Sequence, residues 1–336
     1  AFNAMPPDPH IVGDRWRTLW KERLEGADLW VRRWLEHPHR DAYWAHGSVC
    51  EDYSAIEIPV MAVSGWADGY PNPVFRLVAN LPGPCKGLVG PWSHAYPHLS
   101  LPGPRIGFLQ EALRWWDEWL AGEATGVAEE PRLRVWMQES IRPRSQYAER
   151  PGRWVAERGW PSPAVNETPL RLSAHGLHWP GERLPSDSRR SRSVQSPLSV
   201  GLFGGKWCSY SNGPDLPYDQ REEDGGALTF DTAPLGERVE ILGAPVAELV
   251  VEAERPVAQL ALRLSDRAPD GKTNRVTYGL LNLCHREGSA EPRPLEPGRR
   301  ERVRVPLDHI AQAFPAGHRL RLAISTSYWP LAWAPP

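Results

Sequence analysis

A strand, a helix and a second strand follow one another between residues 58 and 98, and this succession restricts the fold most strongly. The first apolar run is Ile58–Val63. We expect Asn72 to cap the helix that follows and Pro73 to begin it. The helix has one apolar face with spacing i, i+3, i+4 and i+7, formed by Val74, Leu77, Val78 and Leu81. After a Pro-Gly turn comes the second run, Gly87–Gly90. Two strands joined by a helix indicate a parallel sheet.

A carboxylate follows the first strand and an imidazole follows the second. Asp68 stands in Gly65–Gly69 (GWADG) and His94 ends Gly90–His94 (GPWSH), 26 residues further on. Parallel strands bring both to the carboxyl edge of the sheet. In α/β-hydrolases the acid precedes the histidine along the chain, and the serine precedes both. The spacing predicts that Asp68 and His94 meet as acid and base. The alternative is that Asp68 caps the next helix and His94 is a turn histidine.

The two motifs resemble the acid and histidine motifs of the cocaine-esterase / X-prolyl dipeptidyl-peptidase (CocE/NonD, peptidase S15-like) family of serine hydrolases. The segment Trp30–Trp44 and the region from about Trp160 onward also resemble this family, so the resemblance covers nearly the whole chain. It implies the C-terminal part of an α/β-hydrolase with lid helices, followed by an all-β jelly-roll sandwich. It also implies catalytic roles for Asp68 and His94.

A serine hydrolase needs a nucleophile as well as a base and an acid. The nucleophile elbow, Gly-x-Ser-x-Gly, lies between a strand and a helix. No serine of this chain has a glycine two positions before it. Gly83–Gly87 has the spacing with Cys85 at its centre, but it follows a helix and precedes a strand, so we expect Cys85 to be structural. The resemblance puts the serine upstream of the acid. We therefore expect a C-terminal fragment that lacks its nucleophile region and is inactive alone.

The period of the apolar residues changes from 3.6 to 2 near Trp160. Residues 1–150 are predicted to belong to the hydrolase domain, with lid helices at about 10–40, the first of them capped by Asp14. The lid helices could equally be a packing pair that makes no substrate contact. Residues 160–336 are predicted to form the sandwich, cut short at its end. The helix and strand expected before Trp160 are Gly107–Leu120 and Arg132–Met137. The strands expected after it are Leu170–Leu172, Ala227–Phe230, Val239–Leu242, Glu248–Ala253, Gln259–Leu264, Val276–Leu283, Arg302–Leu307 and Arg319–Ile324.

Composition removes several classes of partner. A net charge of −2 gives no reason to expect nucleic acid or an anionic membrane, and no apolar run approaches the ~20 residues of a membrane span. Four scattered cysteines predict no disulfide framework and fit a cytoplasmic location. His94 and His98 are four residues apart, but Pro97 argues against the helix that would aim both at one metal ion. We therefore expect no metal and no cofactor.

The sequence thus predicts a serine hydrolase of the acyl-ester or amide type: an esterase, acylase or X-Pro dipeptidyl-peptidase. It would act through an acyl-enzyme on a small-molecule ester or amide, or on a peptide. His94 would be the general base and then the acid, with Asp68 orienting it. A homo-oligomer is left open. The alternative is a non-catalytic protein whose jelly roll binds carbohydrate or another protein, with the α/β part as a scaffold.

Overall fold

The computed structural model describes residues 5–186 and 190–335. Contacts divide the chain into two units, residues 1–51 with 288–292 and residues 52–287 with 293–336. Across the described ranges, no helix combines the length and apolar character that crossing a bilayer requires.

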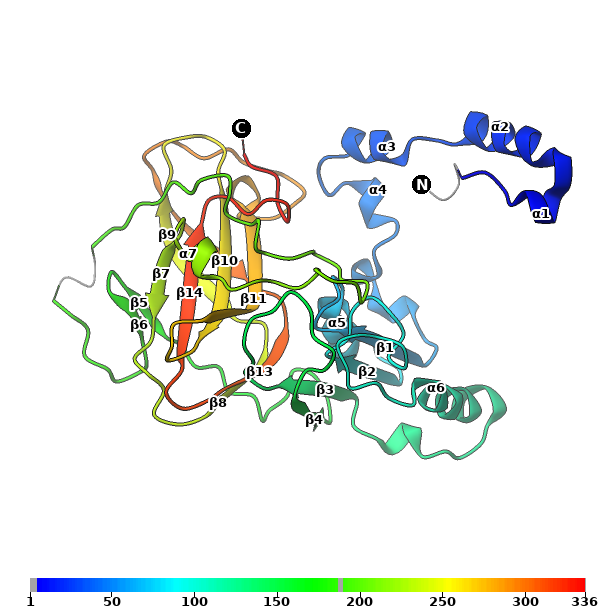
Figure 1. Ribbon diagram of the computed structural model, residues 1–336, viewed down its shortest axis with the longest axis horizontal. Coiled ribbons are helices and arrows are strands. Elements are labelled where there is room, and N and C mark those ends of the chain that lie inside the picture. Colours follow the sequence, from blue (N-terminus) through cyan, green and yellow to red (C-terminus); the bar gives the residue numbers. More distant parts are fainter. Residues whose placement is uncertain (1–4, 187–189, 336) are drawn as a thin grey trace. The chain divides into compact units, whose positions relative to one another are not determined.

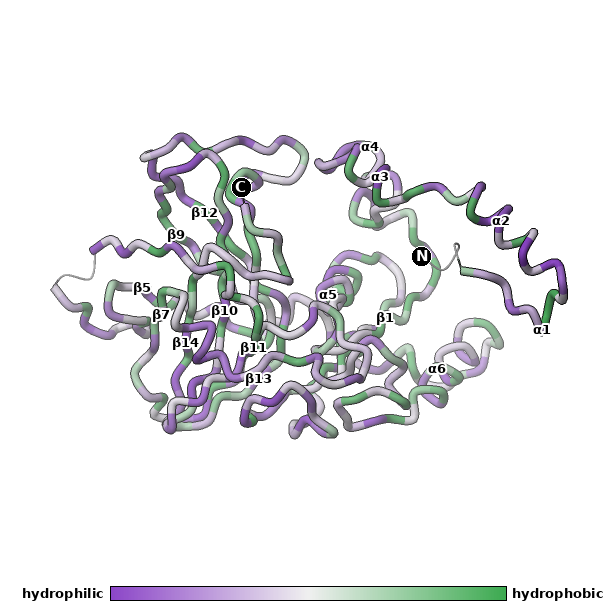
Figure 2. The backbone as a smooth tube through the Cα atoms, turned by 45° about the horizontal axis from the view of Figure 1, so that its top comes forward, coloured by the Kyte–Doolittle hydropathy of each residue, from purple (hydrophilic) through white to green (hydrophobic). Residues whose placement is uncertain are grey.

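The first unit is built from short helices: α1 (Pro9–Val12), α2 (Trp16–Gly26), α3 (Trp30–Glu36) and α4 (Ala42–Ala45). Asp14 does not cap α2 as expected; it lies in a 3₁₀ turn, Gly13–Arg15, and α2 starts after Arg15 without a side-chain cap. Hydrophilic and hydrophobic residues mix along α2 (Figure 2). The described residues of these four helices include no buried side chain, and Trp30 and Trp34 are among the exposed ones. Their role as a lid stays a prediction.

The second unit begins with the predicted strand–helix–strand succession. β1 (Val60–Gly65) and β2 (Cys85–Gly90) pair in parallel, and α5 (Pro71–Asn80) connects them. β3 (Leu133–Gln138) continues the sheet in parallel beside β2. Beyond β3 the sheet continues with β13 (Ile310–Phe314) and then β8 (Val239–Gly243), in the order β1-β2-β3-β13-β8, and β4 (Gly152–Glu157) also pairs with β3 (Figure 1). It is therefore a mixed sheet with a parallel part that starts at β1.

Helix α5 begins at Pro71, two residues before the predicted start, and Asn72 is not its cap. The side chain of Asn72 bonds instead to Asp308 and His309, far along the chain. Val74 and Val78 on the buried face of α5 lie so close to β2 that a Cβ at Gly87 would come within 3.0 Å of both. A glycine at this place is what allows helix and strand to approach.

A second group of strands lies in the region where the sequence predicts the sandwich. β11 (Thr273–Asn282), β10 (Gln259–Arg267), β14 (Arg319–Ser325) and β7 (Leu228–Asp231) form an antiparallel sheet in that order (Figure 1). β9 (Val246–Glu252) pairs with β12 (Arg300–Pro306), and β5 (Arg171–Ser173) pairs with β6 (Gly176–His178). One apolar cluster joins the sheet to the β9–β12 pair through residues such as Leu262, Val303 and Leu322. All eight strands predicted after Trp160 are present, whereas their jelly-roll connectivity stays a prediction.

Strands β8 (Val239–Gly243) and β13 (Ile310–Phe314) come from the C-terminal half but complete the sheet that begins with β1. Strand β4 falls between the two predicted domains, residues 1–150 and 160–336. The main division by contacts lies between Glu51 and Asp52. The boundary expected near residue 160 concerns independent folding and stays a prediction.

The helix predicted at 107–120 is α6 (Phe108–Trp116), followed by a π-helical turn, Asp117–Ala121, that ends at Gly122. Its buried residues are Ala112 and Trp115, whereas Leu109, Leu113, Trp116 and Leu120 are exposed. The predicted helix is thus present, and most of its large apolar residues are exposed.

Candidate active site

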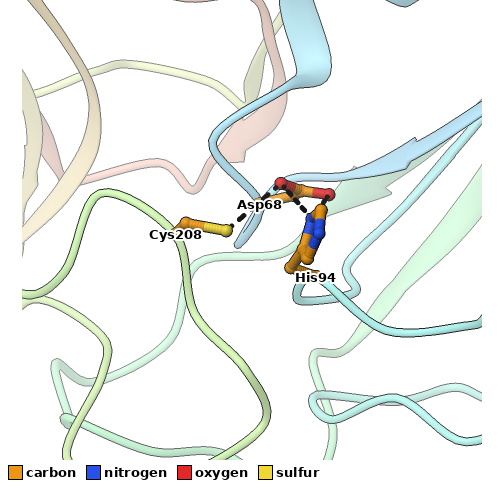
Figure 3. A group of neighbouring side chains, drawn as sticks. All are labelled: Asp68, His94 and Cys208. Atoms are coloured by element: carbon orange, nitrogen blue, oxygen red, sulfur yellow. Dashed lines mark hydrogen bonds and ion pairs between the residues drawn. The ribbon is translucent and has the colours of Figure 1, made fainter. Parts of the chain in front are cut away.

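The parallel pairing of β1 and β2 brings Asp68 and His94 together. Asp68 lies three residues after the end of β1 and His94 four residues after the end of β2, at the same edge of the sheet. His94 Nδ1 is 3.2 Å from each of the two carboxylate oxygens of Asp68 (Figure 3). The side chain of Asp68 is 10% exposed and that of His94 is 45% exposed. The structure therefore places the two residues as the sequence predicts, while their catalytic roles stay a prediction.

Two backbone hydrogen bonds hold the loop of Asp68 against the loop of His94. Trp66 N donates to Gly90 O at 2.9 Å, and Ala67 N donates to Trp92 O at 3.0 Å. A Cβ on Gly65 would lie 2.0 Å from Trp92 O, so only glycine permits this approach. Gly65 does not have a positive φ, and its role here is therefore to leave space rather than to make a left-handed turn.

The residues before His94 anchor its loop. Trp92 is buried and its Nε1 donates to Pro104 O at 2.9 Å. Ser93 is also buried, its backbone N donates to Ser100 Oγ at 3.0 Å, and its hydroxyl lies 2.5 Å from Ser211 Oγ. In the GPWSH motif, tryptophan and serine thus fix the loop and leave the imidazole accessible.

A third segment, between β6 and α7 (Arg221–Asp224), completes the site and was missed from the sequence. Cys208 Sγ donates to Asp68 Oδ1 at 3.6 Å. Its neighbour Ser209 donates its N–H to Ala67 O at 3.1 Å and accepts from His94 N at 2.7 Å. Burial, together with the negative charge of Asp68, raises the pKa of the Cys208 thiol. Cys208 is 140 residues from Asp68 in a segment without a motif, so nothing local in the sequence could have indicated this contact.

The second imidazole nitrogen, Nε2, is available. Within residues 5–186 and 190–335 no hydrogen bond to it is found, and the His94 side chain is 45% exposed. The rings of Tyr70 and Tyr210 flank the imidazole at 5.8 and 5.3 Å between ring centroids. A base held at Nδ1 by a carboxylate and open at Nε2 can take a proton from an approaching group and return it.

The other residues considered from the sequence lie elsewhere. Cys85 is the buried first residue of β2, and burial raises the pKa of its thiol, as expected for a structural cysteine. The ring of His98 stacks on Phe108 at 6.2 Å, and His98 does not join the ligand atoms around Asp68. The only group of three metal-ligand side chains in the described ranges is Asp68, His94 and Cys208.

A pocket of about 110 Å³ opens beside Asp68 and is not lined by His94. Its polar lining includes Arg150, Tyr278 and His309. Burial raises the pKa of Tyr278 to about 12 and lowers that of His309 to about 4, so both are neutral at pH 7. Asp68 therefore borders a polar cavity and also contacts the imidazole of His94.

Sequence comparison finds two families. Residues 3–96 match the X-Pro dipeptidyl-peptidase (S15 family), and residues 125–336 match the X-Pro dipeptidyl-peptidase C-terminal non-catalytic domain. A cocaine esterase of Rhodococcus sp. is 25% identical over 317 residues, which are 88% of this chain and 53% of that protein. A putative serine esterase of Mycobacterium bovis is 26% identical over 317 residues, 87% of this chain and 47% of that protein. The chain thus spans about half the length of the curated relatives it matches.

Solved structures show the same fold at low sequence identity. An α-amino acid ester hydrolase has a TM-score of 0.68 and 19% identity, covering 93% of this chain and 55% of that chain. A CocE/NonD family hydrolase of Staphylococcus aureus has a TM-score of 0.66 and 15% identity, covering 92% and 53%. The mixed sheet and the strands beyond it are therefore arranged as in hydrolases of this type.

Proposed function

We propose, for a chain that belongs to the X-Pro dipeptidyl-peptidase (S15-like, CocE/NonD) family, that it carries the acid and the base of an acyl-transferring serine hydrolase. The observation behind the proposal is the geometry of His94. Its Nδ1 lies 3.2 Å from both oxygens of Asp68, and its Nε2 is unbonded among the described residues. This is the arrangement that a base needs before it meets a nucleophile.

In the proposed reaction, His94 Nε2 takes the proton of a serine hydroxyl while the serine oxygen attacks the carbonyl carbon of the substrate. His94 then gives that proton to the departing alcohol or amine, and an acyl-enzyme remains. Water releases the acid in a second step of the same kind. Asp68 holds the proton on Nδ1 throughout and stabilises the imidazolium. The serine lies outside these 336 residues, since no serine here stands in an elbow motif.

The substrate class we propose is an ester or amide of a carboxylic acid, including X-Pro peptides. The support comes from the relatives, which are called cocaine esterase, serine esterase and α-amino acid ester hydrolase. For the strands after residue 160 we propose a jelly-roll sandwich, on the support of the two layers that share one apolar core.

The test uses the polypeptide produced together with its upstream coding sequence. We expect a burst of p-nitrophenol from p-nitrophenyl butyrate, and slower release of p-nitroaniline from an X-Pro anilide. The substitution His94→Ala should remove the burst, whereas His46→Ala, in the first unit, should leave it unchanged. A burst that persists in His94→Ala would contradict the assignment of the base.

The 336 residues alone should release no p-nitrophenol above background. If they do, and if His94→Ala stops it, then the nucleophile is inside this chain and the proposal about its place is wrong.

A further inference from the structure

We propose that Asp68, His94 and Cys208 bind a zinc ion. One ligand atom from each of the three side chains lies within 4.8 Å of the other two (Figure 3). A carboxylate oxygen, an imidazole nitrogen and a thiolate sulfur are the three kinds of donor with which proteins hold zinc. None of the three residues comes from the same loop as another, so the site exists only in the folded chain.

The separations between the donor atoms fit a tetrahedral ion. His94 Nδ1 is 3.2 Å from Asp68 Oδ1, and Cys208 Sγ is 3.6 Å from the same oxygen. With ordinary zinc bond lengths, these two separations would be roughly 3.4 and 3.6 Å. The third separation, between Cys208 Sγ and the imidazole nitrogen of His94, is at most 4.8 Å. It would have to shorten by no more than about 1.2 Å for both atoms to bind one zinc ion. Two edges of the tetrahedron are therefore formed before any ion arrives.

The backbone around the three donors is already connected. Ser209, next to Cys208, bonds to Ala67, next to Asp68, and also to the backbone of His94 itself. Asp215 holds the same segment, accepting bonds from Ser209 Oγ and Tyr210 N at 3.1 Å each. Because these bonds fix the loops, little conformational freedom remains to be lost when the ion binds.

Charge and burial are also favourable. Asp68 and Cys208 are largely buried, whereas His94 is half exposed. A Zn²⁺ ion with one carboxylate, one thiolate and one neutral imidazole forms a complex without net charge, which costs less to bury than an unpaired ion. The exposed side at His94 leaves the fourth position to a water molecule, as is usual for zinc with three protein ligands.

Binding requires two proton movements. The Cys208 thiol loses its proton to the solvent, and in the neutral imidazole the proton moves from Nδ1 to Nε2 as Nδ1 binds the metal. Under the proposed function, Nε2 is the atom that must accept the serine proton, so the zinc-bound form cannot act as a base. This consequence rests on the proposed function; zinc binding itself does not.

The experiment titrates the reduced 336-residue chain with Co²⁺, whose absorption spectrum reports its ligands, and then displaces it with Zn²⁺. We expect one ion per chain, a thiolate-to-cobalt charge-transfer band, and loss of the band when zinc is added. Nuclear magnetic resonance of the imidazole nitrogens in the unaltered chain should show Nδ1 of His94 as the metal-bound atom. Saturation without a thiolate band, or with the His94 nitrogens unaffected, would overturn the proposal.

Variants separate this site from adventitious binding. Cys208→Ser and His94→Gln should each weaken zinc binding by at least about tenfold, as even loss of an outer partner does at metal sites. Cys50→Ser removes the exposed thiol and Cys284→Ser another buried one, and both should leave the affinity unchanged. Retained affinity in a folded Cys208→Ser chain, or loss of the band in Cys50→Ser, would show that the proposed ligand set is wrong.

Activity is measured separately, with the polypeptide that includes its upstream sequence. Zinc should stop turnover reversibly, with EDTA restoring it, and Cys208→Ser should be less sensitive. If zinc binds as described but turnover continues, the proposed function fails and the metal site stands. If turnover depends on His94 but zinc does not bind, the metal site fails and the proposed function stands.

Discussion

Asp68 receives hydrogen bonds from three segments of the chain. Tyr70 N donates at 3.3 Å, His94 Nδ1 lies at 3.2 Å, and Cys208 Sγ donates at 3.6 Å. A carboxylate can only accept, so each of these contacts fixes which atom carries the proton. An amide in its place would present N–H groups to some of the same donors.

For this reason we expect Asp68→Asn, in the polypeptide with its upstream sequence, to lower kcat by roughly 10⁴-fold, the loss known for the equivalent change in a serine protease. The KM and the circular dichroism spectrum should change little. Asp117→Asn, in the π-helical turn after α6, is the matched control and should retain full activity. A loss of less than about tenfold would contradict an orienting role for Asp68.

Gly65 permits the closest approach between the two loops of the site. In Gly65→Ala the new methyl group would lie 2.0 Å from the carbonyl oxygen of Trp92, which is backbone and cannot rotate away. We expect a loss of about 2 kcal/mol or more in the free energy of unfolding, measured by urea titration. Gly159→Ala, where nothing lies within 4 Å of the added methyl group, should change it by less than about 1 kcal/mol. Equal effects of the two substitutions would contradict this account.

Cys85 is a buried core residue, and we expect it to be dispensable for catalysis. Cys85→Ala should change kcat less than about twofold, whereas loss of a nucleophile costs several orders of magnitude. Stopped-flow measurement of the acyl ester burst separates the two results. A large loss in a correctly folded variant would require Cys85 to take part in the reaction.

At the scale of elements, the strands that face one core could be predicted because their residues alternate. β12 and β14 have this pattern over part of their length and lie within a few residues of the predicted ends. β13 has no alternation, because all five residues are buried between β8 and β3, and period 2 disappears in such strands. The pair Asp68 and His94 was accessible from spacing. Cys208 was not, because a tertiary contact alone brings it there.

The start of α5 was misplaced for a physical reason. Asn72 has the residue type of a helix cap, but its side chain accepts from His309 at 2.9 Å and donates to Asp308. The ring of His309 also stacks on Phe75 of α5, with 4.2 Å between the centroids. The helix is therefore fixed by the segment before β13, which no local pattern reveals.

The same contacts predict a pH dependence of stability. Burial lowers the pKa of His309 from 6.5 to about 4, so the unfolded chain binds a proton more readily than the folded one. The stabilisation contributed by neutral His309 is complete above its pKa in the unfolded chain, about 6.5. It is lost as the pH falls from about 6.5 to about 4, the pKa in the folded chain. This effect should make the free energy of unfolding about 2 kcal/mol lower at pH 5 than at pH 7.

The measurement is urea unfolding at the two pH values. His309→Asn should reduce the difference between them, whereas exposed His46→Asn should retain it. Burial raises the pKa of neighbouring Asp308, which acts in the opposite direction, so the comparison between variant and parent isolates the histidine. An unchanged difference in His309→Asn would contradict the assignment.

At the scale of the whole molecule, the two apolar cores take their residues from different parts of the chain. Every residue of the core beneath β10 and β14 comes from position 170 or later. The core around α5 instead contains Ala311 and packs against Trp160 and Leu242, which all come from position 160 or later. One half can therefore bury its core alone, and the other cannot.

We accordingly expect residues 160–336 to unfold cooperatively as a separate polypeptide, and residues 52–150 to show no cooperative transition. Thermal unfolding followed by near-ultraviolet circular dichroism distinguishes the two. A cooperative transition in residues 52–150, or none in residues 160–336, would show that the cores do not decide folding in this way.

Ser209 bonds to the segments of both Asp68 and His94, although it lies in the region that matches a domain described as non-catalytic. This contact between the two regions has a consequence for how they can evolve. A recombination event that replaced this region with that of a distant relative would also replace part of the wall around the imidazole. We expect the two halves to have diverged together, with compensating changes on either side of this contact, and chimaeras to fail unless residues 207–211 travel with the loops they hold.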